Sequence, residues 1–257
     1  MLRKGDLTQG GITGTLLHFT LPMMVGTFLQ QCYNIADTLI VGQCIGAGAL
    51  AAVGSAYTLM VFLISVLLGL AMGSGTVFSL HYGAGNHVAL RRSIFSSFVL
   101  IGIVTLILNV AVFIWLDPIL RLLQVPQDIY GMMRSYSWII FCGIVFTFIY
   151  NFYASLLRAV GDSVTPLWFL AVSVVLNIAL DLFFILQLDW GIQGAAAATV
   201  LAQGVAALGI IIYTYRRRPE LRWHHEDMCF DRTCLKEIAS FSTLTCVQQS
   251  VMNLGIL

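Results

Sequence analysis

The sequence predicts an all-α integral membrane protein, a six-helix transmembrane bundle followed by the start of a seventh helix. The first reason is composition, since 59% of the 257 residues are hydrophobic and only 10% are charged. That is more apolar surface than one soluble core hides. The second is a series of apolar runs near the roughly 20 residues that a helix needs to cross a bilayer. The third is the sorting of basic residues onto alternate loops.

Residues 1–215 are expected to form the six-helix bundle. A polar loop at 216–237 follows, and 238–257 would be the start of helix seven, cut off at Leu257. Breaker-rich stretches separate the runs, namely "GQCIGAG", "HYGAGNH", "LDPILRLLQVPQD", "AVGDSVTP" and "LDWGIQG". The expected spans, in order, are about 16–41, 51–80, 93–116, 132–157, 166–188 and 194–215.

Charge distribution sets the expected orientation. With the N-terminus in the cytoplasm, only Arg121 and Arg134 of the 13 basic residues fall outside. Cytoplasmic loops of membrane proteins collect Lys and Arg, so we expect a multi-pass protein of the cell (inner) membrane with a cytoplasmic N-terminus. The first run is too long for a signal peptide's apolar region, so it should remain as a span. The inner side takes Arg3, Lys4, Arg91, Arg92, Arg158, Arg216, Arg217, Arg218, Arg222, Arg232 and Lys236.

Several other classes of site are disfavoured. A net charge of +1 without a basic face gives no reason to expect nucleic acid as a partner. The six cysteines lack a regular spacing, so no disulfide framework is expected. "WHHEDMCFDRTC", at 223–234, has adjacent His224 and His225 and an unusual Cys-x4-Cys spacing, which argues against zinc. No cofactor and no structural metal is expected.

Two acidic residues lie well inside predicted spans, and they are the candidates for function. Asp37 is in the first span and Asp181 in the fifth. Polar residues recur around both at helical spacing, with Gln30, Tyr33 and Asn34 before Asp37, and Asn177 four residues before Asp181. A charged side chain at mid-bilayer costs roughly 2.5–3.5 kcal/mol on insertion scales, so these faces should meet inside the bundle.

The depth of these polar residues in the membrane also predicts that they lie together. Counted from the outer ends of their spans, Asp37, Asp181 and Thr199 fall within about one helical turn of one level, at 1.5 Å per residue. Two carboxylates, an amide from Asn177 and a hydroxyl from Thr199 could therefore surround one cation or one exchangeable proton. The plainer alternative is that these groups only hydrogen-bond the helices together, and for Asn177 and Thr199 alone it is the favoured one. For two aspartates at one depth, function is favoured.

Three segments resemble one known family: "YNIADTLIVGQCIGAGALAAVG", "RAVGDSVTP" and "LNIALDLFFILQLDWGIQGAAAATVLAQ". Together they look like the multidrug and toxic compound extrusion (MATE) family, and "YGAGNHVALRR" is also similar. The resemblance implies twelve helices in two six-helix lobes, of which this chain holds the N-terminal lobe. The C-terminal lobe of the same polypeptide would then be a missing partner.

The resemblance also implies a function and a site. It implies an antiporter that uses Na⁺ or H⁺ to expel small organic, mostly cationic compounds, drugs among them, by alternating access. It places the coupling cation, including a possible Na⁺, at Asp37, Asn177, Asp181 and Thr199. Its substrate cavity would include Gln30, Tyr33, Tyr136 and Asn151. Membrane lipid is the other expected partner, and the residues do not distinguish Na⁺ from H⁺.

Three alternatives remain at this point. Two intramembrane aspartates also define membrane aspartyl proteases, but their Gly-x-Gly-Asp motif is missing here and the nearest match, ending at Asp162, is in a loop; no enzyme is expected. A channel or purely structural bundle would show uncoupled ion flux or none. A lipid-linked sugar flippase of related architecture is the runner-up, and it should have a strongly cationic cavity, whereas the predicted spans hold almost no internal Lys or Arg.

Overall fold

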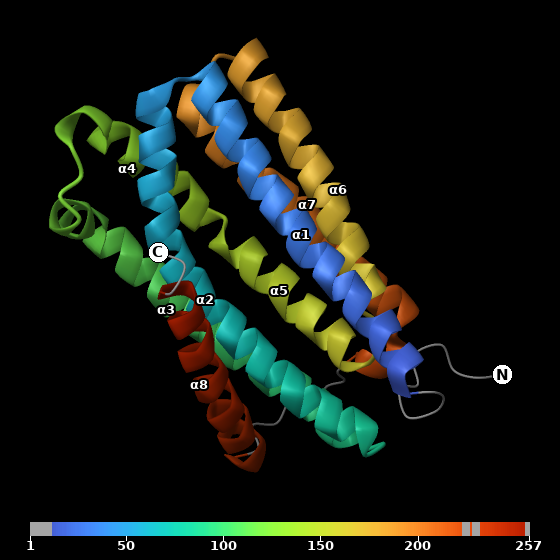
Figure 1. Ribbon diagram of the computed structural model, residues 1–257. Coiled ribbons are helices and arrows are strands. Elements are labelled where there is room, and N and C mark those ends of the chain that lie inside the picture. Colours follow the sequence, from blue (N-terminus) through green and yellow to red (C-terminus); the bar gives the residue numbers. More distant parts are fainter. Residues whose placement is uncertain (1–11, 223–226, 228–231, 255–257) are drawn as a thin grey trace.

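The computed structural model describes residues 12–222, Asp227 and 232–254, and this part of the chain is helical almost throughout (Figure 1). His224, His225 and Cys229, weighed above as zinc ligands, lie outside the described residues. The elements, in order, are α1 (Ile12–Cys44), α2 (Ala47–Gly83), α3 (His87–Leu122), α4 (Gln127–Cys142), α5 (Ile144–Ala159), α6 (Val164–Leu182), the π-helical turn η1 (Phe183–Gln187), α7 (Gly191–Arg217), the 3₁₀ turn η2 (Pro219–Leu221) and α8 (Arg232–Leu254).

Four of these helices are long and apolar enough to cross a membrane: α2, α3, α6 with η1, and α7. A fifth span results if α4 and α5, which meet at a bend of 46°, are taken as one. Helix α1, expected as a span, is not in this set, which was drawn from the described residues alone. The protein is a multi-pass membrane protein.

The bend between α4 and α5 was not expected, since the sequence suggested one continuous span at 132–157. Gly143 separates the two helices. A Cβ atom at Gly143 would lie 2.5 Å from Cγ2 of Val200 on α7. Only glycine therefore allows α7 to approach the bend this closely. The contact is between residues far apart in sequence, and a hydropathy profile does not contain it.

The helices form two groups joined at one end of the molecule. Helices α1, α6 and α7 lie together, whereas α2 contacts α3, α5 and α8 (Figure 1). The chain passes between the groups at the short α1–α2 turn, where Gly46 has φ +116°. A continuous core connects them, because α4 and α5 also pack against α7. Within the second group, Phe78 of α2 packs edge-on against Phe152 of α5 with ring centroids 5.9 Å apart.

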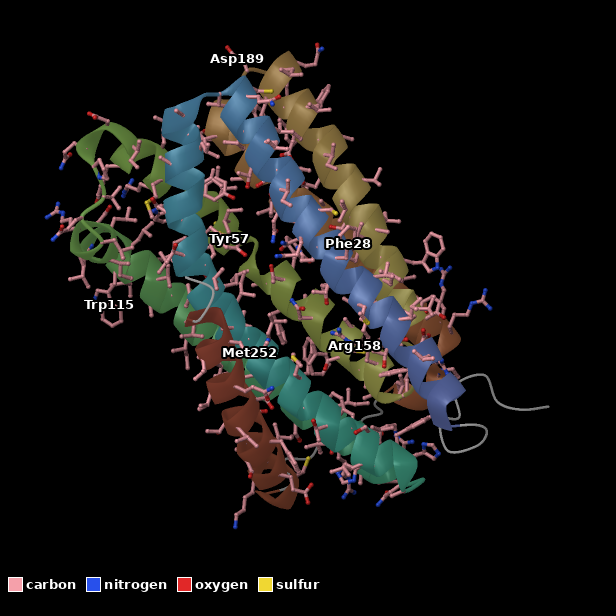
Figure 2. The ribbon with its side chains drawn as sticks, in the orientation of Figure 1. Phe28, Tyr57, Trp115, Arg158, Asp189 and Met252 are labelled. Carbon is pink, nitrogen blue, oxygen red and sulfur yellow. The ribbon has the colours of Figure 1, made fainter. Side chains whose placement is uncertain are left out.

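Large apolar side chains cover the outside of the bundle. Phe28 of α1 and Trp115 of α3 are 71% and 58% exposed, and Trp115 lies at the outer edge of the bundle in Figure 2. A monomeric soluble protein rarely exposes apolar surface on this scale, whereas lipid tails would cover it.

Helix α8 begins earlier than the sequence suggested, at Arg232 instead of near Ile238. The reason is packing, because Cys234 and Ile238 are buried against Val77 of α2. The stretch from Arg216 to Lys236 is therefore not a continuous loop. Within its described residues, α7 runs to Arg217, Leu221 of η2 is buried in the main core, and α8 has begun by Lys236.

Helices α2 and α8 make the most extensive helix contact of the described residues, and small residues allow it. Gly69 and Gly73 of α2 face Cys246 and Ser242 of α8. A Cβ atom at Gly73 would lie 2.4 Å from the Cα atom of Ser242, and one at Gly69 would lie 2.5 Å from the Cα atom of Cys246. Such small-xxx-small pairs let membrane helices approach backbone to backbone.

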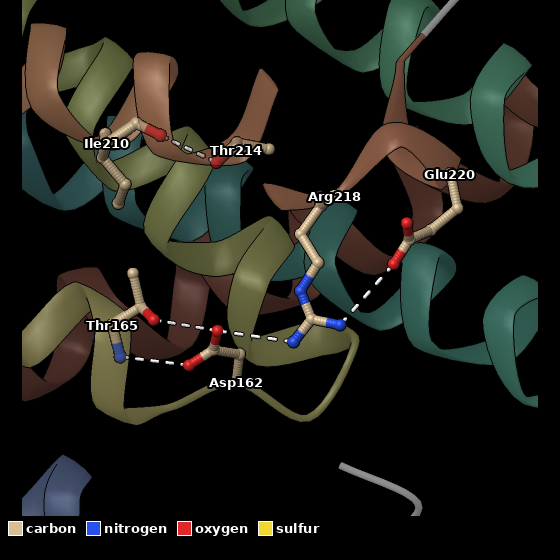
Figure 3. A network of polar contacts seen from close by, with 6 residues as sticks. All are labelled: Asp162, Thr165, Ile210, Thr214, Arg218 and Glu220. Carbon is tan, nitrogen blue, oxygen red and sulfur yellow. Dashed lines mark hydrogen bonds and ion pairs between the residues drawn. The ribbon is translucent and has the colours of Figure 1, made fainter. Parts of the chain in front are cut away.

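Polar contacts fix the turns at the end opposite Asp189. The Asp162 carboxylate accepts hydrogen bonds from the backbone N–H and the hydroxyl of Thr165, at 3.0 and 2.9 Å, at the start of α6 (Figure 3). Arg218, at the end of α7, pairs with Asp162 at 3.4 Å and with Glu220 at 3.5 Å. The α5–α6 turn is thereby tied to the segment that follows α7.

Candidate functional site

The site is built around Asp37 of α1 and Asp181 of α6, which meet inside the bundle. Asp37 is 9% exposed and Asp181 is fully buried. Their carboxyl groups lie within hydrogen-bonding reach of each other. Two ionised carboxylates in contact in a low-dielectric interior repel strongly, so a proton or a cation must be shared between them.

Asn177 lies one helical turn before Asp181 on α6, and it connects Asp181 to α7. In the orientation that satisfies its amide, the nitrogen donates to Asp181 Oδ2 at 3.0 Å and the oxygen accepts from the backbone N–H of Thr199 at 3.2 Å. The same end of the amide also lies 3.3 Å from the Thr199 hydroxyl, so Asn177 contacts Thr199 in either orientation. The amide is fully buried and holds α6 and α7 in register at this level.

Tyrosine hydroxyls complete the polar cluster. Tyr33, one turn before Asp37 on α1, donates from its phenolic hydroxyl to the Thr199 hydroxyl oxygen at 3.3 Å. Tyr136 of α4 is buried and interacts electrostatically with Asp37, Asp181 and Tyr33. Four helices therefore supply one polar cluster to an otherwise apolar interior.

Local sequence explains why these groups share a face. The pairs Tyr33–Asp37 and Asn177–Asp181 are each four residues apart, so each pair lies on one side of its helix. Directly after Asp181 the α-helix widens into the π-helical turn η1. Such π-helical turns are rare and occur often at functional sites.

Two expected cavity residues are not drawn into the cluster. Gln30 is exposed, and the Asn151 amide nitrogen donates to the carbonyl of Thr147 on its own helix at 2.8 Å. Asn34, grouped with Asp37 above, donates to Gln31 at 3.3 Å instead. Within the chain as described, these side chains stand apart from the contact between Asp37 and Asp181.

One polar pair near the cluster was not predicted from the sequence. Thr147 of α5 donates a short hydrogen bond from its hydroxyl to the side-chain oxygen of Gln203 on α7. Gln203 follows Thr199 by one helical turn, so the same spacing rule that grouped Asn177 with Asp181 could have found it.

The donor set fits a small cation or a proton. Oδ1 of Asp37 and Oδ1 of Asp181 are buried and accept no hydrogen bond from any residue that the structure describes. Burying an oxygen that accepts no hydrogen bond costs free energy, and a hard cation or a proton bound to the oxygen would offset that cost. No group of three or more His, Cys, Asp or Glu side chains that could hold a metal ion occurs in the described part of the chain.

Buried ionisable side chains inside a multi-pass helical bundle mark substrate or ion pathways. The MatE family model matches residues 22–183. This chain therefore belongs to the MATE family, whose members are transporters and not enzymes.

Relatives and solved structures support the same family assignment. The chain is 36% identical over 217 residues to the Bacillus subtilis protein named "Probable multidrug resistance protein YpnP", covering 84% of this chain and 49% of that protein. It is 30% identical over 210 residues to the multidrug export protein MepA of Staphylococcus saprophyticus, covering 79% of this chain and 45% of that protein. The chain thus spans about half the length of the curated relatives it matches.

The fold itself matches solved transporters over the whole chain. An outward-facing MATE transporter of the MOP superfamily superimposes with a TM-score of 0.92 at 24% identity, covering 100% of this chain and 57% of that one. A MOP superfamily transporter from Pyrococcus furiosus, described as having a binding pocket of reverse polarity, gives 0.88 at 25% identity, with the same coverage of both chains. The fold is that of half a MATE transporter.

Proposed function

We propose that this chain is the N-terminal lobe of a cation-coupled antiporter that exports small organic, mostly cationic compounds, drugs among them, by alternating access. Asp37, Asn177, Asp181 and Thr199 would hold the coupling ion, Na⁺ or H⁺. Gln30, Tyr33, Tyr136 and Asn151 would line the path of the substrate. Residues 1–215 would form the lobe, and the stretch after it would link the lobe to helix seven of the full transporter, which corresponds to α8 and begins at Arg232.

One observation carries the proposal, the contact between the carboxyl groups of Asp37 and Asp181, each with a buried oxygen that no described residue satisfies. A purely structural role would be served better by apolar residues of similar volume, because burying two carboxyl groups costs more than their contact returns. A site that alternately takes up and releases a cation needs this unsatisfied pair.

Membrane potential gives such a site its driving force. One elementary charge moving inward is worth about 2.3 kcal/mol per 100 mV, enough for roughly 50-fold accumulation of an exported compound. The orientation that uses this force has a cytoplasmic N-terminus in the cell (inner) membrane. It agrees with the basic residues Arg91, Arg158 and Arg218, which lie at the helix ends opposite the α1–α2 and α6–α7 turns.

The test is efflux by a full-length transporter that carries this sequence as its N-terminal half, reconstituted in vesicles. The sodium and proton gradients are collapsed separately while export of a cationic dye is followed. Export that stops when one of the two gradients is removed supports the proposal and identifies the ion. Export that is unaffected by the loss of both would reject cation coupling.

A further inference from the structure

A small pocket lies beside the candidate cation site, on the inner side of the bend between α4 and α5. Its walls are mostly apolar, with Met60 of α2 and Ile144 of α5 among them, but three polar side chains reach it: Thr147, Thr199 and Gln203. The pocket exists because α4 and α5 diverge at Gly143 while α7 passes close by.

The size of the pocket indicates what can bind in it. The centre of a water-sized sphere can move through about 20 Å³ of it. One water molecule needs about 10–15 Å³ by this measure, together with two to four polar partners. The pocket therefore has room for one water molecule.

The hydrogen-bonding groups in the pocket also match one water molecule. The Thr147 hydroxyl gives its proton to Gln203, which leaves the Thr147 oxygen as an acceptor and the Gln203 NH₂ group as a donor. The Thr199 oxygen accepts from the Tyr33 hydroxyl at 3.3 Å, and the Asn177 amide oxygen, in its satisfied orientation, lies 3.3 Å from the Thr199 hydroxyl and can take its proton. One lone pair of the Thr199 oxygen is therefore left to accept a hydrogen bond from the pocket.

From this geometry we infer that the pocket holds one ordered water molecule. It accepts a hydrogen bond from Gln203 and donates one to Thr147 and one to Thr199. The water thereby keeps the Thr199 proton on the Asn177 amide oxygen, which holds the Asn177 amide nitrogen on Asp181. This positioning role rests on the proposed function, whereas the presence of the water does not.

Synchrotron hydroxyl-radical footprinting tests for the water directly, because radiolysis of a bound water oxidises the side chains next to it. In the full-length transporter, Met60 should be oxidised, and Gln203→Leu or Thr147→Val should lower that oxidation at least about five-fold. Thr105→Val is the matched control, since the Thr105 hydroxyl bonds only the Ile101 carbonyl of its own helix, at 2.7 Å. Oxidation of Met60 that is absent, or equal in Gln203→Leu and the native protein, would overturn the water site.

The positioning role has its own readout, the concentration of Na⁺ or H⁺ that gives half-maximal efflux. In Gln203→Leu, loss of the water should raise this half-saturating ion concentration about five-fold, which is the effect of one lost hydrogen bond. The maximal rate of efflux should be preserved. If Gln203→Leu lost the oxidation of Met60 but kept the native half-saturating ion concentration, the positioning role would be overturned. If Asp37→Asn retained ion coupling, the proposed function would fail, while the footprint of the water would stand unaffected.

Discussion

The phenolic hydroxyl of Tyr33 on α1 lies 3.3 Å from the hydroxyl oxygen of Thr199 on α7, and this contact joins two helices that are far apart in the chain. Tyr33→Phe keeps the ring and removes only the donor. We expect a folded transporter in which the half-saturating ion concentration rises a few-fold, because one neutral hydrogen bond contributes about 1 kcal/mol. Efflux titrated against Na⁺ and against pH measures this shift. Loss of all coupling in Tyr33→Phe would mean that the hydroxyl itself holds the ion.

The close approach of α2 and α8 depends on Gly73. Gly73→Ala places a methyl group 2.4 Å from the backbone of Ser242, so one of the helices must move. We expect a loss of roughly 1–3 kcal/mol in the stability of the full-length protein, typical of an overpacked core, read as a lower melting temperature in detergent. Gly54→Ala is the control, since a Cβ atom at Gly54 meets nothing within 4 Å. Equal melting temperatures for the two variants would contradict the packing.

Cys234 of α8 offers a disulfide test of the same helix. Its sulfur lies 3.1 Å from the hydroxyl of Ser93 on α3, and both side chains are buried. In a background where Cys234 is the sole remaining cysteine, Ser93→Cys should form a disulfide under mild oxidation. If α8 parts from α3 during transport, efflux should stop on oxidation and return with a reductant.

Mass spectrometry of the digested protein detects the crosslink. Ser97→Cys, one helical turn further along α3, is the control that should not crosslink. Full efflux by the oxidised, crosslinked Ser93→Cys protein would show that this contact stays closed throughout transport.

The ion pair between Arg91 and Asp227 should matter for stability more than other ion pairs. Arg91 Nε lies 2.7 Å from the Asp227 carboxylate, which is 5% exposed. Arg91→Ala breaks a short ion pair to a buried carboxylate, and we expect a clearly lower melting temperature. Arg134→Ala breaks a pair with Asp117 in which both partners are almost half exposed, and it should change melting little. Equal effects of the two single variants would contradict this ranking.

The sequence was sufficient to predict the helical class and the core of the site. Apolar runs predicted the helices, and i to i+4 spacing put Asn177 beside Asp181 and Tyr33 beside Asp37. A common depth predicted that Asp37, Asp181 and Thr199 come together. These features are local, or follow from the fixed thickness of a bilayer, and therefore a single sequence contains them.

The remaining features depend on contacts between distant segments. Gly143 breaks a span because α7 packs against it through Val200, and α8 starts early because Cys234 and Ile238 find a buried surface. Spacing also cannot tell which polar residue on a helix face points inward, so Gln30 was grouped with Asp37 although its side chain is exposed.

The most direct test of the cation site is Asp37→Asn in the full-length transporter, with gradient-driven efflux measured beside protein abundance and melting temperature. The amide keeps the shape of the side chain and removes the charge that H⁺ or Na⁺ must neutralise, so export should collapse. Abundance and melting should stay level or rise, because a buried amide is less costly than a carboxylate. Asp181→Asn should behave in the same way, whereas Asp162→Asn, which alters only a turn, should keep its ion coupling. Near-normal, ion-dependent export by both Asp37→Asn and Asp181→Asn would contradict the assignment of the cation site.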